Sequence, residues 1–197
     1  MTVFKPYYQE DGITIYHGDC LNIMPTLPDK SIDMILCDLP YGTTSCKWDT
    51  IIPFEPLWKE YKRLIKDNGA IVLTASQPFT SALVMSNLGW FKYEWVWEKN
   101  RGSNFATTKY MPMKEHENVL IFCNGKTIYN PIMQKRAATG KSRAVYVINP
   151  SNTGKREAYG GITADAKMLI NGDIRVPGTV QKINTEVGLH PTQKPVA

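Results

Sequence analysis

The sequence predicts an α/β fold with a mostly parallel β-sheet. Segments typical of strands alternate along the chain with segments typical of helices, which is the pattern of strand–helix–strand units. The chain has 197 residues, enough for one domain with a core of its own. Its composition, 43% hydrophobic and 21% charged, is near the globular average and excludes bulk disorder, collagen-like repeats and a coiled coil.

The first elements expected are two strands joined by an interrupted helix. Residues 12–17 predict a short strand that ends at Gly18. Residues 31–37 predict a second strand, whose apolar run indicates burial on both faces. Between these strands, Pro25 and Pro28 are expected to interrupt a short helix, because proline lacks the amide hydrogen that continues one.

The middle of the chain predicts a longer helix followed by alternating elements. Residues 54–66 carry apolar side chains at helical spacing, and Asn68-Gly69 is expected to end this helix. The apolar positions that define it are Leu57, Tyr61, Leu64 and Ile65. The elements expected next are a strand over 70–75, a helix over 78–88 that ends at Gly89, and strands over 91–99 and 117–123.

Residues 126–188 differ in composition from the rest of the chain. They are polar, rich in Lys, Arg, Gly, Asn and Thr, and contain few long apolar runs. We interpret them as an inserted, loop-rich segment, with a solvated linker as the alternative.

Charge and cysteine content narrow the class of protein. The net charge of +5 and the isoelectric point of about 8.9 are consistent with a polyanionic partner such as nucleic acid, although many other proteins share them. The four cysteines include no pair at C-x-x-C spacing, so no zinc or redox site is predicted. No apolar run approaches the roughly 18 residues of a membrane span, and the N-terminus lacks the pattern of a secretion signal. The expected compartment is therefore the cytoplasm.

The most informative stretch is Asp38-Leu39-Pro40-Tyr41-Gly42, which directly follows the second expected strand. In open parallel sheets, ligands bind beyond the carboxyl ends of the strands. An acidic residue, a proline-restricted turn and an aromatic residue at that place indicate a reaction site, although the same residues are also typical of an ordinary turn.

This stretch resembles the D-P-P-Y motif of S-adenosylmethionine-dependent DNA amino-methyltransferases. Residues 18–42 resemble the N-terminal block of the β class of that family, and residues 99–122 resemble its middle block. The segment HPTQKPV at 190–196 resembles the one that precedes the family's glycine-rich loop. These blocks occur in the family's order, which makes the resemblance more specific than any one motif.

The resemblance implies a Rossmann-like methyltransferase domain with an inserted recognition segment. The catalytic core is expected over residues 1–125, a target-recognition insert over 126–188, and the start of a cofactor-binding segment over 189–197. An F-x-G-x-G pattern after an apolar strand, which the family needs to hold the cofactor, is not found. The chain is therefore expected to be C-terminally truncated, and a non-catalytic remnant that only binds DNA is the alternative to an enzyme.

The family's chemistry implies roles for the motif residues. An exocyclic amino nitrogen is a poor nucleophile because its lone pair is delocalised into the ring. Asp38 and the backbone carbonyl of Leu39 are expected to accept its two hydrogens, while Tyr41 stacks on the base and Pro40 restricts the turn. Leu39 stands where the family usually has proline, but its carbonyl is retained.

The resemblance favours adenine N6 in duplex DNA as the target. Aspartate at the first motif position is more typical of adenine-N6 enzymes, whereas serine is more typical of cytosine-N4 enzymes, which remain the alternative. A protein glutamine methyltransferase would normally carry asparagine there. The target base must leave the stacked duplex to reach the site, as in other base-flipping enzymes.

The cofactor implied is S-adenosylmethionine. The residues expected to bind it are Asp19, Cys20, Asp38, His190, Thr192 and Lys194. Asp19 is equally suited to cap the short helix that follows it. Without the resemblance, residues 190–196 would be interpreted as a terminal loop.

The partner implied is duplex DNA, and the family is also compatible with a homodimer. Basic residues in loops are expected to contact phosphates without selecting a sequence, and an exposed loop tryptophan is expected to touch DNA or cover the base. These candidates are Trp48, Arg101, Asn104, Lys109, Lys135, Arg136, Lys141 and Arg143. Trp90, Trp95 and Trp97 are expected in the core. Glu115-His116-Glu117 is assigned no metal.

Overall fold

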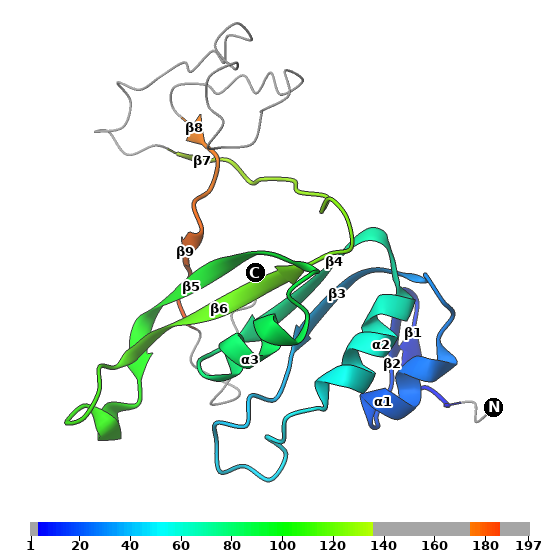
Figure 1. Ribbon diagram of the computed structural model, residues 1–197, viewed down its shortest axis with the longest axis horizontal. Helices are drawn as coiled ribbons and strands as arrows, with labels where there is room; N and C mark the ends of the chain where they lie inside the picture. The colour runs from blue at the N-terminus through cyan, green and yellow to red at the C-terminus, as the bar shows by residue number, and fades with distance from the viewer. Residues whose placement is uncertain (1–3, 136–173, 186–197) are drawn as a thin grey trace, which may run out of the picture. The chain divides into compact units, whose positions relative to one another are not determined.

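The structure is a computed structural model, and it describes residues 4–135 and 174–185 (Figure 1). Contacts divide the chain into two compact units. One unit comprises residues 1–129 and 179–197, and the other comprises residues 130–178. The first unit contains the main sheet and the predicted reaction site.

The N-terminal strands form a hairpin of their own. Strands β1 (Tyr8–Glu10) and β2 (Ile13–Ile15) pair antiparallel across a turn in which Gly12 has a φ of 79°, a conformation that favours glycine. The strand predicted over residues 12–17 therefore exists in shorter form. It pairs with β1 and does not join the main sheet.

The main sheet has five strands in the order β3-β4-β6-β5-β9. Their bounds are β3 (Ile32–Asp38), β4 (Ile65–Ala75), β5 (Phe91–Ser103), β6 (Lys114–Phe122) and β9 (Val180–Lys182). Strand β3 is parallel to β4, and β5 is parallel to β9. Strand β6 is antiparallel to both β4 and β5, so four of the five strands run in one direction. This confirms the predicted α/β fold with a mostly parallel sheet.

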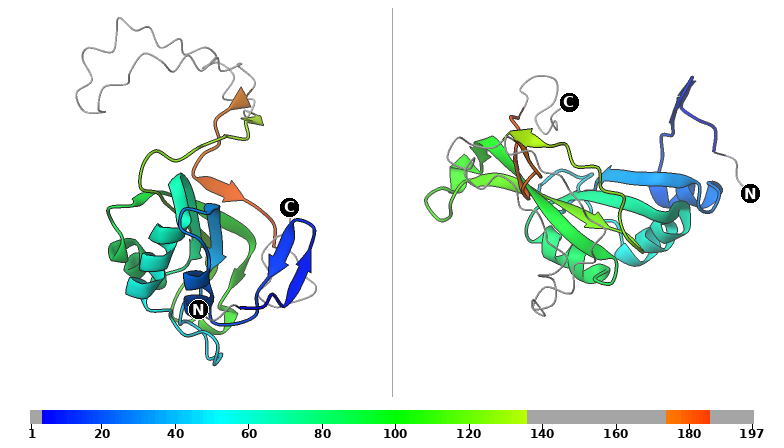
Figure 2. Two further views of the ribbon diagram at one scale, coloured as in Figure 1. Left: turned by 90° about the vertical axis from the view of Figure 1, so that its right-hand side faces the viewer. Right: turned by 90° about the horizontal axis from the view of Figure 1, so that it is seen from above.

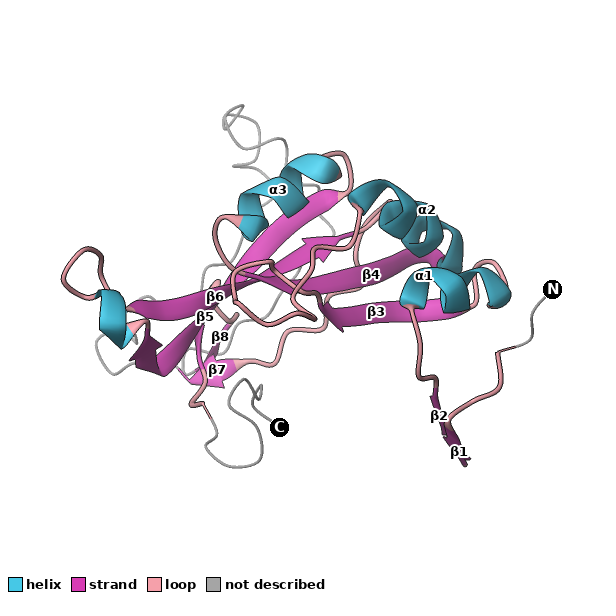
Figure 3. Cartoon of the chain, turned by 90° about the horizontal axis from the view of Figure 1, so that it is seen from below, coloured by secondary structure: helices cyan, strands magenta, loops and turns pink. Residues whose placement is uncertain are grey.

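The helices cover one face of this sheet. Helix α1 (Cys20–Ile23) continues as a short 3₁₀ segment, η1 (Met24–Thr26), at the predicted proline interruption. Helices α2 (Phe54–Leu64) and α3 (Phe79–Ser86) follow β3 and β4. Figure 3 shows α1, α2 and α3 on the same side of the sheet.

The apolar run of β3 predicted burial on both faces of the strand, but only one face is buried. Met34 is 53% exposed and Leu36 is 66% exposed, whereas Ile35 and Cys37 are partly buried and pack against the core. The reason is that none of the described α-helices lies on the face that Met34 and Leu36 share (Figure 3). The apolar run thus reflects one covered face rather than two.

Helix α2 and strand β4 together supply most of the buried core. Three of the apolar positions predicted for this helix, Leu57, Tyr61 and Leu64, are buried in α2 and belong to the same core cluster as residues of β4 and β6. Trp58, which the sequence analysis had not placed in the core, is only 4% exposed and is tilted against Phe122 with 4.9 Å between ring centroids. Of the tryptophans expected in the core, Trp97 is buried, and Trp90 and Trp95 are half-buried.

Helix α2 ends at Leu64 and not at Asn68-Gly69. Ile65 already has extended backbone angles, is 1% exposed and pairs with Ile32 of β3. The register then shifts before Met34 pairs with Ala70, and Asn68 takes a φ of 62° within this irregularity. The Asn-Gly pair therefore forms a bulge inside β4 rather than a helix cap.

Strand β9 lies within the range predicted as an insert, and it extends the main sheet beside β5 (Figure 2). The indole nitrogen of Trp97 donates to the carbonyl of Ile183 at 2.8 Å, and Val96 N donates to Thr179 O at 2.8 Å. In the second unit, β7 (Gln134–Lys135) and β8 (Ile174–Arg175) pair antiparallel. No helix in the described ranges is long and apolar enough to cross a membrane.

Candidate active site

Asp38 is the last residue of β3, and it pairs in register with Thr74 of the neighbouring parallel strand β4. The hydroxyl of Thr74 donates a hydrogen bond to Asp38 Oδ1. The carboxylate of Asp38 is therefore oriented by a side chain from the next strand. It lies at the carboxyl ends of two parallel strands, where the sequence predicted a reaction site.

The hydroxyl of Tyr41 joins this pair. It lies 2.9 Å from Asp38 Oδ1, 2.9 Å from Thr74 Oγ1 and 3.5 Å from Glu117 Oε2. Burial raises the pKa of the Tyr41 hydroxyl well above its usual range, and the negative charges of Asp38 and Glu117 raise it further. The hydroxyl is therefore protonated at any working pH and acts as a hydrogen-bond donor rather than as a base.

Glu117 connects this cluster to the other strands of the sheet. Its Oε1 forms an ion pair with Lys99 Nζ, and the two side chains are only 11% and 15% exposed. Lys99 Nζ also lies 4.9 Å from the ring centroid of Trp97, within cation–π range. Glu117 on β6 faces Trp97 on β5 in register, so the pairing of these strands brings the ion pair together.

The cluster contains Asp38 and Tyr41, which the sequence predicts for the site. It also contains Thr74, Lys99 and Glu117, to which the sequence assigns no role. The sequence suggests a metal or acid–base role for the Glu115-His116-Glu117 stretch but predicts neither. In the described ranges no group of three or more metal-ligating side chains comes together. The signal that could have identified Glu117 is its place in the family's middle block, beside the apolar run of β6.

The ring of Tyr41 is stacked on Phe79, at the start of α3, with 5.3 Å between centroids and an angle of 23° between planes. Phe79 is 3% exposed and also contacts Phe54 at 5.8 Å. One face of the Tyr41 ring is therefore packed against the protein. Leu39, the departure from the family motif, is 5% exposed and belongs to the core.

The loop after the motif is held by Asp49. Its carboxylate accepts the backbone amides of Gly42, Thr43 and Thr44 at 2.7–2.9 Å, and also the Thr44 hydroxyl at 2.8 Å. Burial opposes ionisation of Asp49, but these hydrogen bonds outweigh it and lower its pKa to about 2. Trp48, beside it in the loop, is 65% exposed.

Asp19 and Cys20, predicted to bind a cofactor, lie at the start of α1. Asp19 Oδ1 accepts the amide of Leu21 at 2.9 Å, so this residue caps the helix. Burial raises the pKa of the Cys20 thiol, and the nearby charges of Asp19 and Cys37 raise it further. The start of α1 therefore lies close to the residue that precedes Asp38.

The remaining predicted residues are far apart along the chain. Arg101, Asn104 and Lys109 lie in the β5–β6 hairpin, where Asn104 has a φ of 67°. Lys135 is an exposed residue of β7 in the second unit. The other predicted contacts, Arg136, Lys141, Arg143, His190, Thr192 and Lys194, lie outside the described residues.

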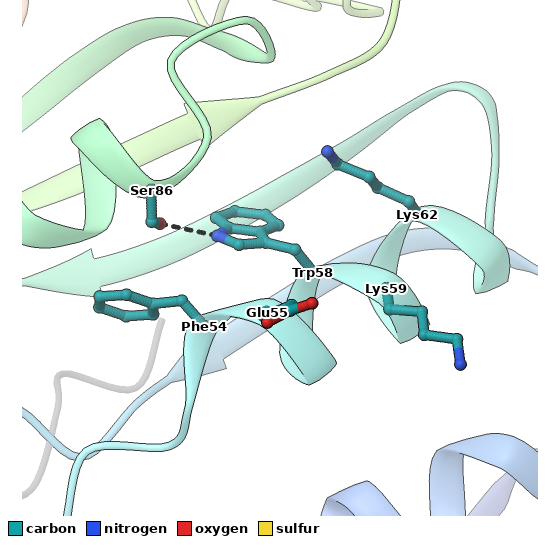
Figure 4. Close-up of a pocket in the computed structure, with 6 residues that line it drawn as sticks. All are labelled: Phe54, Glu55, Trp58, Lys59, Lys62 and Ser86. Atoms are coloured by element: carbon teal, nitrogen blue, oxygen red, sulfur yellow. Dashed lines mark hydrogen bonds between the residues drawn. The ribbon is translucent and has the colours of Figure 1, made fainter.

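A pocket of about 450 Å³ lies apart from these residues, between α2 and α3 (Figure 4). Its lining consists of Phe54, Glu55, Trp58, Lys59, Lys62 and Ser86. The indole nitrogen of Trp58 donates to Ser86 Oγ at 2.7 Å. None of the residues predicted to act in catalysis or cofactor binding lines this pocket.

Residues 32–197 match a family model described as a DNA methylase, named for N6 and N4 methyltransferases. This range is most of the chain and includes β3 to β6 with the motif.

Two curated relatives are type II methyltransferases. M.HinfI of Haemophilus influenzae is 30% identical over 134 residues, which are 54% of this chain and 37% of the relative. M2.MboI of Moraxella bovis is 30% identical over 96 residues, which are 36% of this chain and 35% of the relative. The chain thus spans little more than a third of the length of these relatives.

One solved structure shares the fold with a TM-score above 0.5. The cytosine-N4-specific PvuII DNA methyltransferase gives a TM-score of 0.51 at 12% identity, and the match covers 90% of this chain and 59% of the other. The crystal structure of an M1.HpyAVI–SAM complex gives a TM-score of 0.45 at 21% identity and covers 62% of each chain.

Proposed function

The chain belongs to the N6/N4 DNA methylase family, and from this premise we propose that it transfers a methyl group from S-adenosylmethionine to the N6 amino group of adenine in DNA. The observation that carries this proposal is the position of Asp38. Its carboxylate ends a strand of the matched region and is oriented by Thr74 and Tyr41.

The proposed task of the motif is to hold the two hydrogens of the exocyclic amine. Asp38 accepts one of them and the backbone carbonyl of Leu39 accepts the other, which turns the nitrogen lone pair towards the methyl donor. The transferred methyl leaves the nitrogen with a positive charge until it loses a proton. A carboxylate and a carbonyl beside it stabilise that charge as it develops.

Thr74 and Tyr41 serve this task by holding Asp38 Oδ1 in place. Both are hydroxyl donors to the same oxygen, at the end of a strand that is fixed by its neighbour. Glu117 and Lys99 complete the support behind Tyr41. A carboxylate that is already oriented needs little rearrangement when substrate binds, which is how positioning accelerates a two-substrate transfer.

The described residues fit a cationic cofactor. S-adenosylmethionine supplies a methyl group on a positively charged sulfur, and carboxylates suit that charge. Asp38 and Asp19 offer such groups, and Asp19 Oδ1 also accepts the amide of Leu21. We assign Asp19, Cys20 and Asp38 to this ligand, together with His190, Thr192 and Lys194 beyond the described residues.

Adenine N6, rather than cytosine N4, is supported by aspartate at the first position of the motif. The target base is proposed to leave the duplex before it reaches Asp38. Trp48 and the basic residues of the β5–β6 hairpin and of the predicted insert are proposed to contact the DNA.

The test is transfer of labelled methyl from S-adenosylmethionine to a mixed-sequence duplex, followed by digestion of the DNA to nucleosides. We expect label in N6-methyladenine, and none with Asp38→Ala. Asp33→Asn is the matched control, because Asp33 is a carboxylate of the same strand that pairs only with exposed Lys66 in the described structure. Label in N4-methylcytosine would refute the assigned target, and unlabelled DNA with a folded protein would refute the activity.

A further inference from the structure

We propose that the tip of the β5–β6 hairpin, residues 104–113, is a wedge for duplex DNA that places Phe105 and Tyr110 into a gap in the base stack. This proposal rests on the proposed function, since DNA methylation inside a duplex requires the target base to leave the stack. From the sequence alone, this hairpin is expected to be a polar loop that contacts phosphates.

The tip is not polar. Phe105 is 82% exposed and Tyr110 is 80% exposed, and Met111 and Met113 are 51% and 44% exposed. Four large apolar side chains within ten residues are more than scattered surface residues. Exposed aromatic and methionine side chains in one short segment indicate a surface that is covered by a partner.

The tip is nevertheless ordered by its own backbone. Thr107 N donates to Asn104 O at 3.0 Å, Thr108 N to Phe105 O at 3.3 Å, and Tyr110 N to Thr107 O at 2.8 Å. These bonds build the 3₁₀ segment η2 (Phe105–Thr107) and the turn after it. The aromatic side chains are therefore presented on a fixed backbone, which lowers the entropy cost of binding.

The positive charge of the hairpin indicates a negatively charged partner. Residues 100–114 contain Arg101, Lys109 and Lys114 and no aspartate or glutamate. Lys109 Nζ lies 5.8 Å from the ring centroid of Tyr110, so an aromatic and a cation are offered side by side. Cations beside exposed aromatic rings match a nucleic acid, with phosphates for the cations and base faces for the rings.

The hairpin projects past the carboxyl ends of β3 and β4 (Figures 1 and 3), and Asp38 is the last residue of β3. Asp38 pairs with Thr74, and Thr74 pairs with Val119 of β6. Strand β6 begins at Lys114, five residues before Val119. At the rise of a β-strand, the base of the tip therefore lies roughly 17 Å along β6 from the row of paired residues that contains Asp38. Lys114 Nζ also contacts Gln77 O at 3.4 Å, in the loop that leads to Phe79.

The wedge and the motif would then act on one duplex. A base that leaves the stack towards Asp38 leaves a gap behind it, and an apolar side chain that fills this gap keeps the base outside. Moving a base out of the stack costs free energy of unstacking and unpairing, and this cost is smallest when the base is already missing. DNA with a preformed gap should therefore bind more tightly than intact DNA.

The experiment compares binding of the full chain to a mixed-sequence duplex and to the same duplex with one central abasic site, at several salt concentrations. We expect the wild-type protein to prefer the abasic duplex by roughly five- to hundredfold, the range of one base–aromatic stacking contact. The variant with Phe105→Ala and Tyr110→Ala should bind both duplexes equally. Lys109→Ala should weaken both duplexes alike and lower the slope of log affinity against log salt by about one.

Met85→Ala is the matched control, because Met85 is 69% exposed on α3 and should not alter the preference. Equal binding of both duplexes by the wild-type protein, or an unchanged preference in the double variant, would overturn the wedge. Self-association that the double variant abolishes, with its preference intact, would instead identify the tip as an interface between two copies. Asp38→Ala should keep the preference while methyl transfer is lost, so failure of the wedge and failure of the proposed activity are distinguishable.

Discussion

The ring of Tyr41 stacks on that of Phe79, with 5.3 Å between centroids, while its hydroxyl lies 2.9 Å from Asp38 Oδ1. One residue of the motif thus has two separable functions in the structure. Its face holds the turn against α3, and its edge orients the carboxylate. Substitutions at Tyr41 and at Phe79 can separate these functions.

Tyr41→Phe should keep the stack and remove the hydrogen bond. We expect kcat for methyl transfer to fall roughly tenfold, about 1.4 kcal/mol, with KM for S-adenosylmethionine little changed. Because burial raises the pKa of Tyr41, its hydroxyl stays protonated and should leave no limb in the pH–rate profile. An alkaline limb that is present in the wild-type protein and absent in Tyr41→Phe would contradict the donor role.

Phe79→Ala should instead act on stability. Phe79 is 3% exposed and contacts both Tyr41 and Phe54, so its truncation leaves a cavity beside the motif. We expect the free energy of unfolding to fall by about 3–5 kcal/mol, measured by urea denaturation. Phe105→Ala is the control for loss of a phenyl ring: at 82% exposure it should change stability by no more than about 0.5 kcal/mol.

The sequence predicted the elements and the motif because both are local patterns. Strand β3 with Asp38, and helix α2 with its buried stripe, follow from side-chain periodicity within a few residues. The resemblance of the sequence motifs predicted the DNA methylase family, and the match over residues 32–197 confirms that prediction.

The rest of the site depends on pairing between distant segments. Thr74 reaches Asp38 only because β4 lies beside β3 in a given register, and Lys99 reaches Glu117 across β5 and β6. No local spacing encodes these registers. In the same way, the exposure of Leu36 depends on which face of the sheet the helices cover, and the apolar run alone could not reveal that.

Lys99 and Glu117 should contribute to the free energy of unfolding as a coupled pair, so that the effects of substituting them are not additive. Lys99→Met removes the ammonium group that pairs with the Glu117 carboxylate at a site that is 11% exposed, which should cost about 3 kcal/mol of stability. Combining it with Glu117→Gln should recover part of this loss, because the substitution also removes the charge that Lys99 had paired with. A double-mutant cycle by thermal or urea unfolding measures the coupling, and additive effects within about 0.5 kcal/mol would contradict it.

The pH dependence of stability should contain a contribution from Asp49. Its pKa is lowered to about 2 in the folded protein, below its ordinary value of 3.8, so the stabilisation is complete above about pH 4 and is lost as pH falls from 4 to 2. Asp49→Asn should lower the free energy of unfolding at neutral pH by about 2 kcal/mol, a cost typical of hydrogen bonds to a charged group. The difference between the two proteins should shrink below pH 4.

Asp67→Asn is the matched control for this loop carboxylate. Asp67 is 83% exposed and pairs with a half-exposed Lys30, so its removal should change stability by less than about 1 kcal/mol. A wild-type minus Asp49→Asn difference that stays constant from neutral pH down to pH 2 would show that the Asp49 charge does not hold the loop.

Two glycines in the same part of the fold should respond in opposite ways to alanine. At Gly69, in the bulge of β4, a Cβ would lie 2.8 Å from the backbone oxygen of Asp33 and 2.7 Å from Ile65 Cγ1. The backbone oxygen cannot move aside without disturbing the pairing of β3 with β4, so Gly69→Ala should cost about 1–3 kcal/mol by urea denaturation. At Gly89 no atom lies within 4 Å of an added Cβ, and Gly89→Ala should be neutral or stabilise by up to about 1 kcal/mol. Equal effects at both positions would mean that β4 can straighten its bulge, and that Asp38 and Thr74 do not depend on this register.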